Sequence, residues 1–61
     1  MKNLKKLRKE RGLTQKELAK KAYITREYLS DLERGKFECS IKTARFLAKA
    51  LECDWMEIYD D

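Results

Sequence analysis

The sequence predicts an all-α domain in which five short helices enclose one small core. Apolar residues recur three and four positions apart, as on one face of a helix, and no segment alternates as a half-buried strand does. Proline is absent and glycine occurs only twice, so few residues would interrupt a helix. With 61 residues we expect one domain over residues 1–61.

The first two helices are predicted from their start and stop signals. The first is expected over Lys2–Arg11, ended by Gly12 in a left-handed conformation. The second begins after Thr14, because Thr14 and Glu17 have the spacing of a capping box. The side chains expected to face the core are Leu4, Leu7, Leu18, Ala19 and Ala22.

Three further helices are predicted in the same way. Thr25 is placed to cap a helix over Arg26–Arg34, and Ser40 to cap a fourth. Asp54 and Glu57 repeat the capping-box pattern at the start of a short fifth helix. The core residues expected here are Leu29, Leu32, Ile41, Ala44, Leu47, Ala48, Leu51, Trp55 and Ile58, with Phe37 filling the core from a loop.

The charge is divided unevenly along the chain. Residues 1–36 contain twelve Lys or Arg and five Asp or Glu, whereas residues 37–61 contain three and six. A basic first half and an acidic second half indicate that one side of the domain meets a polyanion. The alternative is a lysine-rich surface that is merely solvated.

The two cysteines are expected to be free thiols. Cys39 and Cys53 flank the fourth helix, which would hold them ~18 Å apart, and a disulfide requires Cα atoms within ~7 Å. No secretory signal is visible, and no apolar run approaches the ~20 residues that span a bilayer. A cytoplasmic protein without a membrane partner is therefore expected.

Enzyme chemistry is not expected from these residue types. Histidine is absent, the cysteines have no evident base partner, and no glycine-rich phosphate loop occurs. Two distant cysteines cannot complete a tetrahedral metal site. We expect no cofactor, no metal and no small-molecule ligand.

The segment from Gln15 to Gly35 carries the functional prediction. Two helices joined by only three or four residues must cross steeply, which is the helix-turn-helix arrangement, and the small Ala19 permits a close approach. The second helix of such a pair can place its outer face in the major groove of DNA, ~12 Å wide.

The outer face of this third helix is polar but has no net charge. Such a face suits reading of base edges better than general binding of phosphates. Arg26 could bind guanine, and Glu27 or Asp31 could accept a hydrogen bond from cytosine. An ordinary solvated face is the alternative. The residues predicted on this face are Arg26, Glu27, Ser30, Asp31 and Arg34.

Three separated runs resemble one family. LKKLRKERGLTQKELA at 4–19, TREYLSDLERGK at 25–36 and SIKTARFLAKAL at 40–51 are similar to the lambda-repressor-like, Cro-type (XRE) helix-turn-helix domains. The resemblance extends over residues 4–58, with the motifs in the family's order and spacing. It implies a compact five-helix lambda-repressor-like fold and a small transcriptional regulator of bacterial or phage type, most often a repressor in this family.

The resemblance also implies roles for single residues. Arg26, Glu27 and Asp31 match base-reading positions of the third helix. Arg8 and Glu33 match an ion pair that ties the first helix to the third. The positions that match contacts to backbone phosphates are Gln15, Thr25, Arg34 and Lys36.

Three positions depart from the family pattern. Tyr23 stands where the turn usually has glycine, so either the turn bends differently or the tyrosine is strained by ~1 kcal/mol or more. Cys39 replaces a usual proline before the fourth helix, and Glu52 a usual glycine after it. Looser boundaries are expected at both places.

Four large side chains have no evident core role. Phe46, Met56 and Tyr59 are expected to be exposed, and a domain this small exposes such groups at a cost. They predict a two-fold homodimer that binds a palindromic operator, the alternative being scattered surface hydrophobes. Tyr28 is interpreted as a half-buried packing residue, with contact to a thymine methyl or sugar as the alternative.

The partner expected from all these features is double-stranded DNA. A protein-interaction module on the same scaffold, such as an antitoxin-like or adaptor domain, is the main alternative, because a fold does not fix a function. Gln15 and the positive Arg26, Arg34 and Lys36 favour DNA. RNA is a weaker option, since no aromatic stacking platform is evident.

Overall fold

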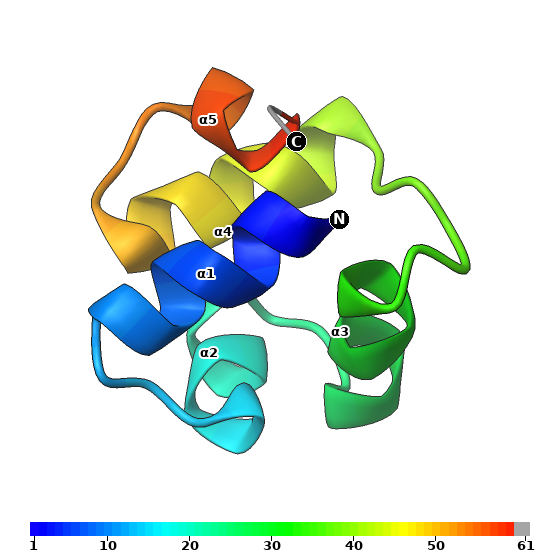
Figure 1. The fold of residues 1–61 in the computed structure, drawn as a ribbon, viewed down its shortest axis with the longest axis horizontal. Helices are drawn as coiled ribbons and strands as arrows, with labels where there is room; N and C mark the ends of the chain where they lie inside the picture. The colour runs from blue at the N-terminus through cyan, green and yellow to red at the C-terminus, as the bar shows by residue number, and fades with distance from the viewer. Residues whose placement is uncertain (60–61) are drawn as a thin grey trace.

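The computed structural model describes residues 1–59, which form five helices in succession (Figure 1). No strand occurs within these residues, so the predicted all-α class is confirmed. The helix bounds differ from the predicted ones by a residue at most where both ends were predicted. They are α1 (Lys2–Glu10), α2 (Gln15–Lys21), α3 (Arg26–Glu33), α4 (Ile41–Leu51) and α5 (Trp55–Tyr59).

Side-chain oxygens cap the first turns of α2, α3 and α4. Thr14 Oγ1 accepts a hydrogen bond from Glu17 N at 3.1 Å, and Glu17 Oε1 accepts one from Thr14 N at 2.9 Å. Thr25 Oγ1 caps α3 by accepting from Tyr28 N at 3.1 Å, and Ser40 caps α4 in the same way. These bonds satisfy backbone donors that a helix start leaves unpaired. The predicted caps are therefore confirmed.

The first four helices all end with one residue in the left-handed region. Gly12 and Gly35 take φ angles of 68° and 79°, while Tyr23 and Glu52 take 60° and 56°. In each case the next amide donates to the carbonyl five residues before it, as Ile24 N does to Ala19 O at 3.0 Å. This is the Schellman motif, which favours glycine at the left-handed position. Tyr23 and Glu52 keep the motif without glycine, so the looser end expected for α4 is not found.

The core lies where the five helices meet. Figure 1 shows α1 in front of α4, with α5 beyond one edge and α2 and α3 side by side at the opposite end. Helix α4 packs against α5 and α2, and α1 packs against α5 and α3. Trp55 is half-buried against this core. The large side chains that are fully buried are Leu4, Leu18, Leu29, Leu32, Leu47, Leu51 and Ile58.

Two residues predicted in the core are exposed, and these predictions were wrong. Phe37 is 46% exposed, because the buried residue of its loop is Cys39 instead; the Phe37 ring lies against Tyr28, with centroids 6.3 Å apart. Ile41 is 56% exposed. It is the first residue of α4, and a helical side chain leans toward the N-terminus, which here carries it past the packed part of the helix.

The prediction that both cysteines are free thiols is confirmed. Cys39 and Cys53 are both free thiols, and burial raises the pKa of the Cys53 thiol. Among residues 1–59, no helix is both long enough and apolar enough to cross a membrane.

Candidate nucleic-acid interface

A tight turn sets α3 against α2. Only residues 22–25 separate Lys21, the last residue of α2, from Arg26, the first of α3. Ala19 and Ala22 are 2% and 0% exposed at this junction, and their small side chains let the two helices approach closely. The left-handed Tyr23 then reverses the chain. The result is the helix-turn-helix that the short connection predicted.

Helix α3 has one buried side and one open side. Leu29 and Leu32 are completely buried, and α3 packs against α2 and α1. On the open side Arg26, Glu27 and Arg34 are exposed and Ser30 and Asp31 are half-buried. With Gln15 these residues line a single shallow hollow. We call the five residues Arg26, Glu27, Ser30, Asp31 and Arg34 the α3 outer face.

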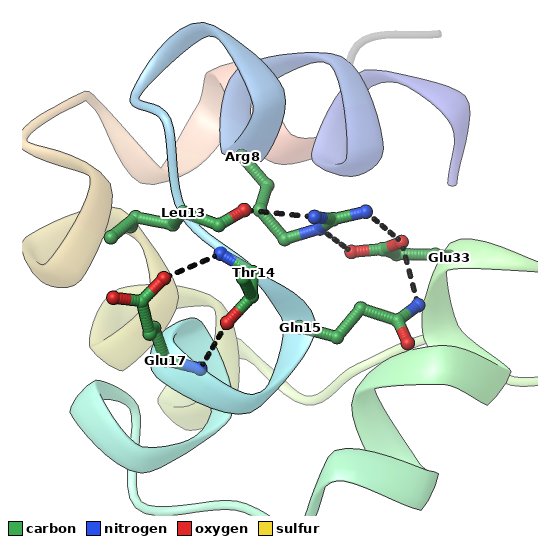
Figure 2. A network of polar contacts seen from close by, with 6 residues as sticks. All are labelled: Arg8, Leu13, Thr14, Gln15, Glu17 and Glu33. Atoms are coloured by element: carbon green, nitrogen blue, oxygen red, sulfur yellow. Dashed lines mark hydrogen bonds and ion pairs between the residues drawn. The ribbon is translucent and has the colours of Figure 1, made fainter.

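Gln15 reaches this hollow from the first residue of α2. Its Nε2 donates a hydrogen bond of 3.1 Å to Glu33 Oε1, as Figure 2 shows. An amide nitrogen has two protons, so one remains to bind another acceptor. The bond to Glu33 was not predicted from the sequence, because it joins two residues that lie 18 positions apart.

The Glu33 carboxylate is also the partner of Arg8. Arg8 Nε donates to Glu33 Oε2 at 2.7 Å and Arg8 Nη2 to Glu33 Oε1 at 3.2 Å. A third donor, Arg8 Nη1, binds the carbonyl of Leu13 at 2.9 Å (Figure 2). The side chains of Arg8 and Glu33 are only 10% and 3% exposed. This Arg8–Glu33–Gln15 network joins α1, the following loop, α2 and α3 directly behind the outer face.

Further polar groups surround the outer face. Lys36 follows α3, where it is exposed and its ammonium lies 5.6 Å from the centre of the Phe37 ring. Thr25 is exposed, and its hydroxyl accepts the capping bond, which leaves its proton free to donate. A neighbouring hollow is lined by Arg8, Thr14, Gln15, Lys16 and Arg26. Thr14 and Lys16 were not among the predicted site residues, although both adjoin Gln15 in sequence.

The three residues predicted at a dimer interface are all exposed on the domain. Phe46, Met56 and Tyr59 are 36%, 60% and 37% exposed. Phe46 lies on α4, where its ring and the ring of Tyr23 pack edge to face with their centroids 5.6 Å apart. Met56 and Tyr59 lie on α5, and the Tyr59 hydroxyl donates to the carbonyl of Cys39 at 2.7 Å. Tyr59 is therefore anchored as well as exposed.

Tyr28 is half-buried against the core. Its ring faces Phe37 on the side of α3 that adjoins the loop to α4. The interpretation of Tyr28 as a packing residue is confirmed.

Comparison with known sequences places this arrangement in a family. The sequence profile of the helix-turn-helix family matches residues 4–58, which include all of α2, α3 and the turn between them. The chain belongs to the helix-turn-helix family. Its expected Cro-type (XRE) membership and five-helix fold are thereby confirmed, and it is a helix-turn-helix domain of the DNA-binding transcriptional-regulator class.

The similar proteins include repressors and regulators. The chain is 48% identical over 48 residues to the immunity repressor protein of Bacillus phage phi105, an alignment that covers 79% of this chain and 33% of the repressor. It is 39% identical over 56 residues to an HTH-type transcriptional regulator of Sinorhizobium fredii, covering 92% and 73%. A regulator of Deinococcus deserti is 51% identical over 45 residues, covering 74% and 35%. The chain thus spans about a third of the phage and Deinococcus relatives.

Proposed function

We propose that this domain recognises a specific double-stranded DNA sequence by inserting α3 into the major groove, and that it represses transcription. The observation that carries the proposal is the α3 outer face, which stands open to solvent while Leu29 and Leu32 hold the other side of the helix in the core. An exposed helix of this kind, crossed by a second helix at its start, matches the groove geometry of helix-turn-helix proteins. The relation to a phage immunity repressor supports repression. Such a protein would act in the cytoplasm.

The proposal divides the site into residues that read bases and residues that hold the backbone. The outer face carries two positive and two negative side chains, so most of the affinity must come from phosphate contacts at its end and around it. One amide proton of Gln15 is hydrogen-bonded to Glu33, and the other is available to bind a phosphate. The base-reading residues are Arg26, Glu27, Ser30 and Asp31. The phosphate contacts are Gln15, Thr25, Arg34 and Lys36.

The proposal includes a homodimer on a palindromic operator. The backbone of the domain spans 23 × 22 × 19 Å and presents one α3, so one copy places one recognition helix, whereas successive major grooves lie ~34 Å apart. Two copies side by side have the required dimension. The exposed Phe46, Met56 and Tyr59 are the proposed contacts between them.

Selection of bound duplexes from a random pool tests the specificity. We expect enrichment of a palindromic sequence whose half-sites are separated by about one helical turn. The affinity for the selected duplex should then fall with salt, with a log–log slope of about −0.9 for each phosphate neutralised. Failure to enrich any duplex, or a binding constant that does not change with salt, would contradict DNA recognition. The second result would favour a protein partner, as in an antitoxin-like or adaptor domain.

Sedimentation at micromolar concentration tests the dimer separately. The wild-type domain should sediment as a dimer or as a concentration-dependent mixture, whereas Phe46→Glu should be a monomer. Lys16→Glu serves as the control, because it also adds a carboxylate to an exposed helix position but lines a hollow that contains none of the proposed dimer contacts. A monomeric wild type, with or without the operator, would contradict the proposed pairing.

A further inference from the structure

One face of α1 is an unbroken stripe of lysines. Lys2, Lys5, Lys6 and Lys9 recur at the spacing that places residues on one side of a helix, and all four are exposed. The buried residues of α1, which are Leu4, Leu7 and Arg8, lie on the opposite side. We call these four lysines the α1 lysine face.

The fold does not need this accumulation of positive charge. Lysines three and four residues apart on a helix repel one another, and Lys2 also stands at the positive end of the helix dipole. The first turn of α1 contains no acidic residue. Within residues 1–59 the only ion pair is Arg8–Glu33, so the carboxylate nearest to this face in α3 is already engaged. Because these lysines lower the stability of α1 in the free domain, their presence on one face is explained more simply by binding of a negatively charged ligand.

The α1 lysine face borders the α3 outer face. The stems of the four lysines and Arg34 line one broad hollow, together with Glu10 and the paired Glu33. Arg34 also lines the hollow of the outer face, with Gln15 and Arg26. One arginine therefore belongs to both surfaces, which are continuous across the junction of α1 and α3.

We infer that the α1 lysine face binds the DNA backbone next to the groove that α3 enters. This inference rests on the proposed function. The major groove is ~12 Å wide, whereas the domain is at least 19 Å across in every direction, so surface beside α3 extends beyond the groove walls. The duplex carries one negative charge per ~1.7 Å of its axis. The lysine face thus meets phosphates outside the recognised sequence and adds affinity without adding specificity.

A pair of double variants tests this assignment. Lys5→Gln/Lys9→Gln removes two charges from the α1 lysine face, and Lys20→Gln/Arg45→Gln removes two exposed charges elsewhere. Lys20 and Arg45 line neither the hollows of α1 and the outer face nor the hollow around Phe46. Both double variants have the same net charge. A difference in their DNA binding therefore reflects where the charges were removed rather than the total charge of the domain. Circular dichroism melts establish that both are folded.

The measurement is the salt dependence of binding to two duplexes, one selected and one of random sequence. The α1 double variant should reduce the magnitude of the log–log slope by about 0.9 for each phosphate that is no longer neutralised, which is about 1.8 for each protomer and about 3.6 for a bound dimer. Its affinity should fall by the same factor on both duplexes. The control double should keep the wild-type slope. Equal slopes for the two doubles would overturn the inference.

Two other outcomes remain distinguishable. If the wild-type domain itself shows no salt-dependent binding to either duplex, the proposed function is wrong, and the inference that the lysine face binds DNA is wrong as well. If wild type binds DNA with the slope of the α1 double, but binds phosphatidylserine-containing vesicles that the α1 double does not bind, the face is a membrane contact and the inference is wrong. A weakening confined to the selected duplex would also overturn it, because a backbone contact does not depend on sequence.

Discussion

Glu33, the last residue of α3, receives two hydrogen bonds from the guanidinium of Arg8 on α1, at 2.7 and 3.2 Å. The same carboxylate also accepts a hydrogen bond of 3.1 Å from Gln15 Nε2 on α2. Every buried side-chain nitrogen or oxygen in the described part of the chain has a partner. One carboxylate therefore fixes the relative positions of three helices behind the α3 outer face.

Removal of Arg8 should be one of the most damaging single changes. Arg8→Ala leaves Glu33 buried and short of its charge partner, and breaking such a pair costs about 3–5 kcal/mol. Urea unfolding followed by circular dichroism measures this decrease in the free energy of unfolding. A decrease below about 1 kcal/mol would mean that water reaches the carboxylate.

The paired replacement separates stability from geometry. Arg8→Met/Glu33→Leu removes both charges and fills the same space, so it should recover most of the stability that Arg8→Ala removes. It also deprives Gln15 of its acceptor, so DNA affinity should stay below wild type. If stability is not recovered, the ion pair and its hydrogen bonds stabilise the fold by more than the apolar side chains that replace them.

The parts of the structure that were predictable from sequence are those with local causes. Thr14 with Glu17 determines a helix start within four residues, and the leucines of α3 mark its buried side through their spacing. Phe37 was misplaced because a loop has no periodicity to show which residue turns inward, and there Cys39 does. The Arg8–Glu33 pair was implied only by family resemblance. The Gln15–Glu33 bond depends on how α2 and α3 meet, which no local pattern contains.

At position 23, glycine should destabilise the domain less than alanine. The φ of 60° at Tyr23 costs a residue with a Cβ roughly 1–2 kcal/mol. Tyr23→Ala keeps that strain and removes the ring packed on Phe46, whereas Tyr23→Gly removes the ring and the strain together. We therefore expect the glycine variant to be more stable than the alanine variant by about 1 kcal/mol in urea unfolding.

Glu52 provides the matched comparison. It has a φ of 56° and is exposed at the end of α4, but unlike Tyr23 it has no ring to pack against Phe46. Glu52→Gly should exceed Glu52→Ala in melting temperature, as at Tyr23. If alanine equals glycine at both sites, the left-handed turns are not strained.

Stability at alkaline pH should depend on Tyr59. Burial, followed by the hydrogen bond with Cys39, raises the pKa of Tyr59 to about 12, against about 10 in an unfolded chain. The unfolded state therefore releases this proton first. The contribution is fully present below about pH 10 and disappears as the pH rises toward 12.

The difference between wild type and Tyr59→Phe isolates this effect, since the lysines titrate in both proteins. Phenylalanine cannot donate to the Cys39 carbonyl, so it should cost about 0.5–1.5 kcal/mol at neutral pH. The stability gap between the two proteins should close between pH 10 and 12. A gap that stays constant across this range would show that Tyr59 ionises equally well in the folded domain.

Gln15 and Arg26 should affect DNA binding in different ways, although they line the same hollow. Gln15 is proposed to hold a phosphate, so Gln15→Ala should weaken binding to all duplexes by a similar factor. Arg26 is proposed to bind a base edge, so Arg26→Ala should cost about 1–3 kcal/mol on the selected operator and relax its preference at one base pair. Competition binding against duplexes substituted at each operator position measures both patterns, with Lys20→Ala as a control at an exposed position that lines neither hollow of the site. If Arg26→Ala lowered the affinity for every duplex equally, the arginine would be a backbone contact and the base-reading role would pass to the other residues of the α3 outer face.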